Sequence, residues 1–210
     1  MSKDLNPEKA LIFRIVHLKN LAILLDGGMR CQNSKNLGAY FQIGNPELIA
    51  RRPHRAVPCG PGGTLSDYVP FYFTPYTPML YNIKTGHNGI ERQNVSDILI
   101  FVASLHTLKK QNVPFVFSDR HAYLKTALFS SDLNDLSRIN WAILQERDFR
   151  KSDIDRFERY QAEALVHKRV PFEALSGIVC YTDSVATAVK AELSQRGLTV
   201  KVLAQPQWYL

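Results

Sequence analysis

The sequence has few cysteines, no uninterrupted apolar run at its start and no glycine-rich nucleotide motif. Its three cysteines, Cys31, Cys59 and Cys180, include no C-x-x-C pair, which argues against a disulfide framework or a zinc site and favours a reducing cytoplasm. Charged side chains interrupt residues 1–25, so this segment predicts neither a signal peptide nor a membrane span. Neither G-x-G-x-x-G nor G-x-x-x-x-G-K-[ST] occurs, so a Rossmann or P-loop nucleotide site has no support.

The composition is that of one globular domain over residues 1–210. Hydrophobic residues make up 45% of the chain and charged residues 21%, enough for a core without disulfides or a structural metal. Lysine and arginine number 26 against 19 acidic residues, a net charge of +7. Such a field favours polyanions such as nucleic acid, although many basic proteins bind none, and both interpretations stay open on charge alone.

Mainly apolar segments indicate where the sheet should form. The sequence predicts strands at 10–18, 98–104, 113–119, 163–168, 177–183 and 198–204. The two most apolar, 98–104 and 113–119, should lie centrally. Helices are predicted at 19–28 and at 184–196, the second with Asp183 as its N-cap. Because strands and helices do not alternate regularly, we expect an α+β fold with an antiparallel or mixed sheet.

Two proline-containing segments interrupt this pattern. Residues 32–63 show no clear period, which predicts a long loop with a short helix around residues 46–52, and loops of this length are usually functional or disordered. Residues 67–83 contain three prolines, so we expect only short extended pieces at an edge or rim of the sheet.

Glu163 stands where a polar segment turns into the apolar run 164–166. A carboxylate at the mouth of a buried strand is either a solvated strand end or a fixed catalytic group. Residues two apart on an extended chain face the same side, so Gln161 should point into the same cleft. An amide beside a carboxylate suits recognition of a sugar hydroxyl. Q-x-E is a frequent pattern, and both interpretations remain open on it alone.

Three further groups of residues are candidates for binding. The basic cluster of Arg51, Arg52 and Arg55 with His54 forms either a pyrophosphate clamp or a solvated basic face. The aromatic stretch at residues 71–81 should place Phe71 and Phe73 in the core and leave Tyr76 and Met79 for stacking on bases. His121, after the strand at 113–119, either orients a ligand or caps a loop.

Together these segments resemble a known family. The order RIVHLKNL, GNPELIARR, GGTLSDYVPFYFTPYTPML, VPFVFSDRHA, RYQAEALV and a final WYL is similar to the DarT family of bacterial toxins, NAD-dependent ADP-ribosyltransferases that act on bases of single-stranded DNA. The resemblance covers essentially the whole chain, and the combination of GGTL-x-DYVPFYFTP-x-x-PM with Q-A-E is highly specific. It implies an α+β fold with an ADP-ribosyltransferase-like core of two facing, mainly antiparallel sheets and flanking helices.

The resemblance also implies roles for individual residues. Glu163 would be the catalytic glutamate and Arg52 the second essential residue, on a loop that folds over NAD. The implied NAD contacts are Arg14, Ile15 and Val16, the latter two through backbone groups, together with Ile23, Cys31 and Arg52. The implied DNA contacts are Tyr76, Thr77, Pro78, Met79, Leu80, Tyr81, His121, Arg147 and Arg150. Arg14 stands where many relatives carry a histidine, and a first-strand arginine holds the dinucleotide in another branch of the same fold.

The implied reaction uses NAD as co-substrate and no metal. ADP-ribose would pass to a base in single-stranded DNA. The motifs GNPELI and GGTLSDYVPFYFTP are closer to the thymidine-modifying branch of the family than to the guanosine-modifying branch, so thymidine is the implied target. The family also implies a cytoplasmic toxin, a macrodomain antitoxin on another chain and no membrane partner. Two alternatives remain: a non-catalytic single-strand-binding module, and transfer to protein, against which Gln161 argues because arginine-modifying members usually carry E-x-E.

Overall fold

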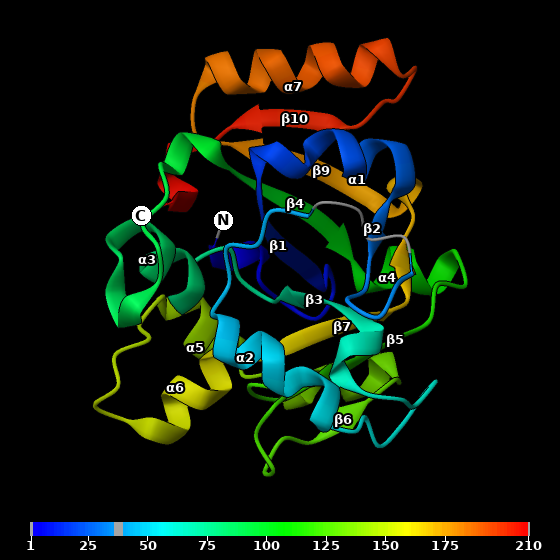
Figure 1. Ribbon diagram of the computed structural model, residues 1–210. Helices are drawn as coiled ribbons and strands as arrows, with labels where there is room; N and C mark the ends of the chain where they lie inside the picture. Colours follow the sequence, from blue (N-terminus) through cyan, green and yellow to red (C-terminus); the bar gives the residue numbers. More distant parts are fainter. Residues whose placement is uncertain (1, 36–39, 210) are drawn as a thin grey trace.

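The computed structural model describes residues 2–35 and 40–209, and a large mixed sheet organises it (Figure 1). In spatial order the strands are β10 (Lys201–Ala204), β9 (Leu175–Cys180), β4 (Ile98–Ser104), β1 (Leu11–His17), β3 (Tyr68–Tyr72), β7 (Glu163–His167), β5 (Phe115–Ser118) and β6 (Phe129–Ser130). All neighbours pair antiparallel except β9 and β10, which are parallel. Short strands β2 (Met29–Arg30) and β8 (Arg169–Val170) form a separate ladder. The predicted α+β class and its mainly antiparallel sheet are confirmed.

The sheet consists of two halves with a narrow connection. The pair formed by β1 and β4 is in register over seven residues, whereas β1 and β3 share one register pair, Phe13 with Tyr72. The expected two facing sheets are therefore not fully confirmed, because the eight strands form one hydrogen-bonded sheet. The connection at β1 and β3 matters because the candidate site opens there.

The prediction of an edge or rim position for residues 67–83 is wrong. Strand β3 lies between β1 and β7. Proline lacks the N–H that a β-ladder needs. The N and C=O of one strand residue face the same edge, however, so the nitrogen of Pro70 faces the same neighbour as its carbonyl. That neighbour is β1, because the Pro70 carbonyl accepts a hydrogen bond from the Arg14 side chain at 2.7 Å. Because β1 and β3 barely pair there, the missing N–H of Pro70 costs no ladder bond.

Seven α-helices surround the sheet in the described part of the chain. They are α1 (Leu21–Gly27), α2 (Pro46–Arg51), α3 (Pro78–Thr85), α4 (Leu105–Lys110), α5 (Trp141–Glu146), α6 (Ile154–Tyr160) and α7 (Asp183–Gln195). Helix α7 lies beside β10 at one end of the sheet, and α2 crosses near β3 and β7 (Figure 1). No helix within residues 2–35 and 40–209 has the length and apolar content needed to cross a membrane.

Helix capping explains two further differences from the prediction. Helix α3 forms where only extended pieces were expected, because Pro78 occupies the first helical position, which needs no N–H, and the Thr77 hydroxyl accepts a hydrogen bond from Leu80 N–H at 3.0 Å. At α7 the N-cap is Thr182, whose hydroxyl accepts from Val185 N–H, and Asp183 is already helical. The helix predicted near residues 46–52 and all six predicted strands are confirmed, with ends that differ by a few residues.

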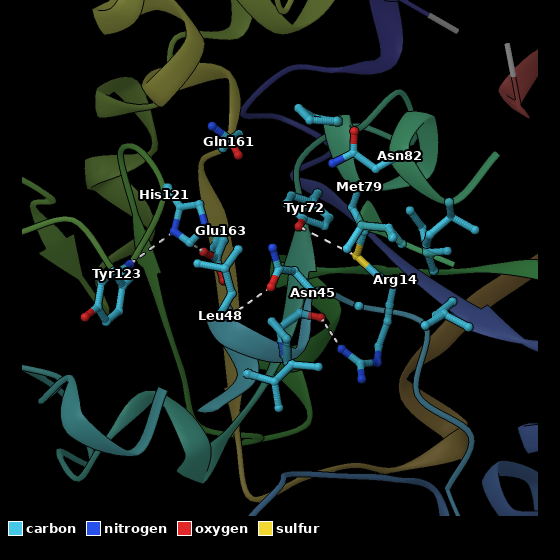
Figure 2. A pocket seen from close by; sticks show the side chains of 18 of the residues that line it. Arg14, Asn45, Leu48, Tyr72, Met79, Asn82, His121, Tyr123, Gln161 and Glu163 are labelled. Atoms are coloured by element: carbon cyan, nitrogen blue, oxygen red, sulfur yellow. Dashed lines mark hydrogen bonds and ion pairs between the residues drawn. The ribbon is translucent and has the colours of Figure 1, made fainter. Parts of the chain in front are cut away.

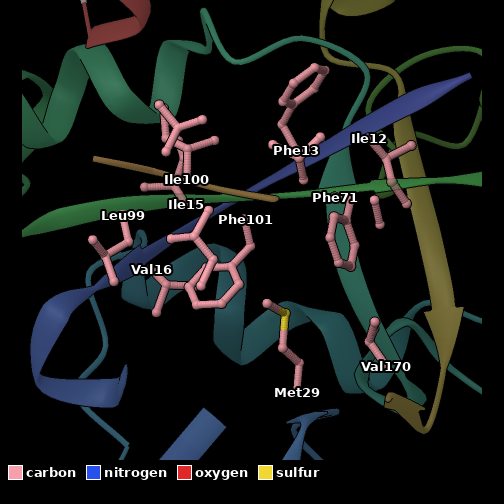
Figure 3. Close-up of a cluster of buried hydrophobic side chains, with 14 of the residues drawn as sticks. Ile12, Phe13, Ile15, Val16, Met29, Phe71, Leu99, Ile100, Phe101 and Val170 are labelled. Atoms are coloured by element: carbon pink, nitrogen blue, oxygen red, sulfur yellow. The ribbon is translucent and has the colours of Figure 1, made fainter. Parts of the chain in front are cut away.

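The main hydrophobic core lies on β1 and β4 (Figure 3). Every residue of β4 is buried, as its apolar sequence predicts for a central strand. Phe71 and Phe73 are fully buried, which confirms the prediction that they belong to the core. Since side chains alternate along a strand, their burial turns the neighbouring residues of β3 toward the opposite face.

Candidate active site

A cleft of about 650 Å³ lies along the face of β3 that points away from the core (Figure 2). Its lining combines side chains from β1, β3, β7, α2 and α3 with residues 40–45 and the segment that follows β5. Volumes of this size are typical of pockets for small molecules and cofactors. Glu163, Arg52 and His121 meet at one part of this lining.

Glu163 is the first residue of β7, and only 4% of its surface is exposed. Its Oε1 accepts a hydrogen bond from Ala122 N–H at 3.0 Å and lies 3.3 Å from His121 Nδ1. Its Oε2 accepts a hydrogen bond from Arg52 Nη1 at 3.3 Å. Both carboxylate oxygens thus have donors, so Glu163 is a fixed group and not a solvated strand end.

Arg52 reaches Glu163 from the end of α2. Helix α2 starts at Pro46 with the Asn45 side chain as its N-cap, accepting from Glu47 N–H at 2.8 Å. Arg52 directly follows this helix, and its Nη2 also donates to Leu65 O at 3.3 Å. The side chain is largely buried, so its pair with Glu163 is shielded from water.

The other arginines of the basic cluster do not share this site. Arg51 lies 3.8 Å from Glu47 in an exposed ion pair. Arg55 donates to the backbone oxygens of Ala122 and Leu124, at 3.4 and 2.9 Å, and so ties the segment after β5 in place. Of the three arginines, Arg52 alone is in the cleft lining within the described residues.

An ion network around the buried side chains of Asp119 and Arg120 holds the segment that carries His121 and Ala122. Asp119 accepts hydrogen bonds from Leu128 N–H at 2.9 Å and from Arg159 at 3.4 Å. Arg120 pairs with Asp155 and Glu158 of α6, at 3.1 and 3.2 Å. The segment before His121 is therefore fixed to the helix that leads into Glu163.

Three residues of β3 form one wall of the cleft, and sequence reasoning missed them. Tyr68, Pro70 and Tyr72 alternate with the buried phenylalanines, so the same period that identified the core could have identified this wall. Tyr72 pairs in register with Glu163, and burial, with a smaller contribution from the Glu163 charge, raises the pKa of its phenol above the usual range. Burial raises the pKa of Tyr68 to about 12. The Tyr68 hydroxyl donates a hydrogen bond to Gly62 O at 2.7 Å, and the Tyr72 hydroxyl donates to Met79 Sδ at 3.8 Å.

Arg14 of β1 faces this wall (Figure 2). Its Nη1 donates to Pro70 O, whereas its Nε is buried and has no hydrogen-bond partner among residues 2–35 and 40–209. A buried N–H without an acceptor is costly and uncommon in folded proteins. A ligand oxygen in the cleft would remove this cost.

Comparison with known proteins decides the family. A sequence model of the DarT family, described as ssDNA thymidine ADP-ribosyltransferase, matches residues 13–210. The chain belongs to the DarT family. It is 48% identical to a DNA ADP-ribosyl transferase of Escherichia coli O127:H6 (strain E2348/69 / EPEC), over 99% of this chain and 97% of that relative.

Solved structures of a DarT protein are similar over nearly the whole chain. Thermus sp. 2.9 DarT in complex with ADP-ribosylated ssDNA has a TM-score of 0.90 and 34% identity, covering 97% of this chain and 98% of that one. The same protein in complex with NAD+ has a TM-score of 0.87 and 33% identity, covering 97% and 99%. The fold of this chain is therefore one that has been solved with NAD+ and, separately, with ADP-ribosylated ssDNA.

The residues expected to bind NAD in this DarT family member divide into two groups. Arg14, Ile15, Cys31 and Arg52 line the cleft. Val16 is buried in the core and Ile23 lies at the surface of α1, and neither is part of the lining. The first group lines the same cavity as Glu163.

The residues expected to contact DNA divide in the same way. Those in the cleft lining are Pro78, Met79, Tyr81, His121 and Arg150. Tyr76, Thr77 and Leu80 are buried, and Arg147 stacks on the Tyr76 ring at 3.8 Å outside the lining. Their structural tasks are visible, since Thr77 caps α3 and Leu80 packs in the core.

Several lining residues gave no signal in the DarT sequence. Tyr40, Gln42 and Ile43 come from an irregular segment without a period to interpret. No group of three or more His, Cys, Asp or Glu side chains that could hold a metal ion occurs in the described ranges.

Proposed function

We propose that this chain transfers ADP-ribose from NAD to a thymidine base in single-stranded DNA and releases nicotinamide. The observation that carries the proposal is Glu163, a buried carboxylate with both oxygens fixed by donors, in the cleft of a protein of the DarT family. The solved relative binds NAD+ in one structure and ADP-ribosylated ssDNA in another.

The residues of the cleft fit NAD as a substrate. The unpartnered Nε of Arg14 offers a donor to an anionic or hydroxyl oxygen, and Arg52 offers a guanidinium suited to phosphate oxygens. Ile15 and Cys31 add apolar surface to the same cavity. Val16 and Ile23 stay in the proposal as residues that act from behind the lining.

In the proposed reaction the bond between the nicotinamide nitrogen and the ribose carbon breaks, and its electron pair leaves with nicotinamide. The ribose then carries oxocarbenium-like positive charge, and a ring nitrogen of the base attacks its anomeric carbon as that nitrogen releases its proton to solvent water. Glu163 accepts a hydrogen bond from the ribose 2-hydroxyl, a contact that strengthens as positive charge develops. The donors around Glu163 hold its carboxylate in one orientation for this task.

Arg52 has a different task in this proposal. A guanidinium stays protonated at neutral pH, so it is a poor proton acceptor. Arg52 instead binds the pyrophosphate and stabilises the anionic form of the base as its proton leaves. Its position 3.3 Å from Glu163 puts it within reach of both events.

The target base must be outside a duplex because its ring nitrogen is paired there, and single-stranded DNA avoids an unstacking cost of roughly a few kcal/mol. Met79, Tyr81, His121 and Arg150 are the proposed contacts that line the cleft. Pro78 lines the cleft beside them, and we assign supporting positions behind the lining to the remaining candidates, which are Tyr76, Thr77, Leu80 and Arg147.

We also propose that residues 1–210 act as one domain, a cytoplasmic toxin whose effect is reversed by a macrodomain antitoxin on another chain. The family resemblance supports the pairing. The three free cysteines, Cys31, Cys59 and Cys180, suit a reducing compartment.

The test is incubation with labelled NAD and single-stranded oligonucleotides, one without thymidine and one without guanosine, alongside a matched duplex. We expect a mass gain of one ADP-ribose on every single strand that contains thymidine and little on the duplex. Label on the thymidine-free strand alone would move the target to guanosine. Salt-sensitive binding without label on any strand would instead identify a non-catalytic binding module.

A further inference from the structure

One wall of the cleft is held in place by very few interactions of its own. Residues 40–45 are irregular, and five of these six residues line the cleft. Residues 40–44 make no backbone–backbone hydrogen bond with any other residue that the structure describes. This wall continues directly into α2, and Arg52 follows α2 in the chain, so the position of the wall also affects the position of the Arg52 backbone.

Among the residues that the structure describes, the hydrogen bonds that hold residues 40–44 come from a single side chain, Asn20. Its Nδ2 donates to Phe41 O at 2.8 Å, and its Oδ1 accepts from Phe41 N–H at 2.7 Å. Asn20 is 1% exposed and does not line the cleft. The carboxamide therefore pairs with Phe41 as a neighbouring strand would, from behind the wall.

Because its side chain binds Phe41, Asn20 does not make the hydrogen bond that would cap α1. It occupies the N-cap position of α1, where asparagine normally accepts a hydrogen bond from the first turn, yet its side chain makes no such bond. The carboxamide is committed to Phe41 instead.

The Phe41 ring is held at the same place. It packs on the His17 imidazole, with ring centroids 4.4 Å apart, and the Lys19 ammonium lies 4.4 Å from its centre. We call Asn20, His17, Lys19 and Phe41 the Asn20 clasp. His17, Lys19 and Asn20 come a few residues after Arg14 and Ile15, which also line the cleft. The clasp therefore joins the part of the lining on β1 to the part at residues 40–45.

We propose that Asn20 is a positioning residue for the reaction: it holds residues 40–45, and through α2 the Arg52 side chain, in the arrangement that binds NAD. The inference rests on the proposed function. Asn20 itself touches no reacting atom.

The test compares Asn20→Ala and Asn20→Asp with a matched control, Asn94→Ala. Asn94 is an exposed asparagine outside the cleft, and its side chain accepts a hydrogen bond from Ser96 N–H at 3.0 Å. Asn20→Asp keeps an acceptor for Phe41 N–H but turns a carboxylate oxygen toward Phe41 O, so it should be no better than alanine.

For both Asn20 variants we expect the KM for NAD to rise about tenfold or more while kcat at saturating NAD stays within about threefold, because bound NAD restores the wall. Asn94→Ala should leave both constants within about twofold of the unmodified protein. A lower kcat with an unchanged KM would mean that Asn20 serves stability alone, and it would overturn the inference.

A second measurement does not depend on catalysis. Chymotrypsin cleaves after aromatic residues, and Tyr40 and Phe41 lie in the wall. Cleavage there should be faster in Asn20→Ala than in the unmodified protein or in Asn94→Ala, and NAD should slow it. Equal cleavage rates would overturn the clasp. Failure of the unmodified protein to modify DNA would overturn the proposed function instead, and the cleavage comparison would still decide the clasp.

Discussion

Replacement of Glu163 by glutamine should abolish most of the transfer while leaving the protein folded. The two side chains have the same shape, but an amide has only one oxygen. In the structure both Glu163 oxygens accept, from Ala122 N–H at 3.0 Å and from Arg52 Nη1 at 3.3 Å. In Glu163→Gln the amide NH2 must therefore face one of these donors.

The magnitudes separate the two effects. One lost hydrogen bond with a charged group costs about 1.5–3 kcal/mol, and at roughly 2–4 °C per kcal/mol for a chain of this size the Tm should fall by about 3–12 °C. The protein stays folded if its stability lies in the usual range of about 5–15 kcal/mol. Loss of one transition-state contact in a preorganised site costs about 2.7–4 kcal/mol, which is a fall of roughly 100- to 1,000-fold in rate.

The assay is single-turnover transfer to a thymidine-containing single strand at saturating NAD, with NAD binding followed by calorimetry. The matched control is Glu192→Gln, which removes a carboxylate 2.6 Å from Arg196 that does not line the cleft, and its transfer rate should stay within about threefold. Transfer by Glu163→Gln within threefold of the unmodified protein, with NAD bound, would refute the role of the Glu163 charge.

Three further outcomes follow from single contacts. Arg14→Met should weaken NAD binding by about 10- to 150-fold in calorimetry, the equivalent of one charge-assisted hydrogen bond of about 1.5–3 kcal/mol; unchanged affinity would separate Arg14 from NAD. The hydrogen bond from Lys168 holds the pKa of the Asp67 carboxyl well below its usual range. This bond therefore stabilises the fold fully above the unfolded pKa of about 4, and the stabilisation is lost as pH falls toward the folded pKa. The Tm difference between the unmodified protein and Asp67→Asn should shrink from pH 6 to pH 2. Arg120→Met leaves Asp119 buried with one fewer partner and should lower the free energy of unfolding by about 3 kcal/mol in urea denaturation, whereas a loss below about 1 kcal/mol would mean that the network contributes little.

The sequence predicted the parts of the fold that the pattern of apolar residues alone determines. The apolar period identified the strands and the burial of Phe71 and Phe73. It failed at residues 67–83, because proline is compatible with two structures that the sequence alone does not distinguish. Pro70 lies in a central strand at an edge without a ladder, and Pro78 starts a helix.

The candidate site shows the same division. The family resemblance indicated Glu163 and Arg52, and the structure brings their side chains within 3.3 Å although 110 residues separate them in the chain. It could not indicate residues 40–43, whose place depends on a buried carboxamide that the sequence suggests only as a helix cap. A tertiary contact overrides the local preference there, so no local pattern predicts it.

Glu163 depends on two irregular segments that are anchored separately. Residues 40–45, which the Asn20 clasp holds, lead into the helix that positions Arg52. The segment that Asp119 and Arg120 fix to α6 positions the Ala122 N–H. Because the anchors lie outside the cleft and share no residue, their loss should affect different constants. Damage to the clasp should appear in the KM for NAD, whereas damage to the Arg120 network releases the Ala122 N–H that orients the carboxylate and should appear in kcat. The precision of the site therefore resides in buried polar contacts that never touch a substrate.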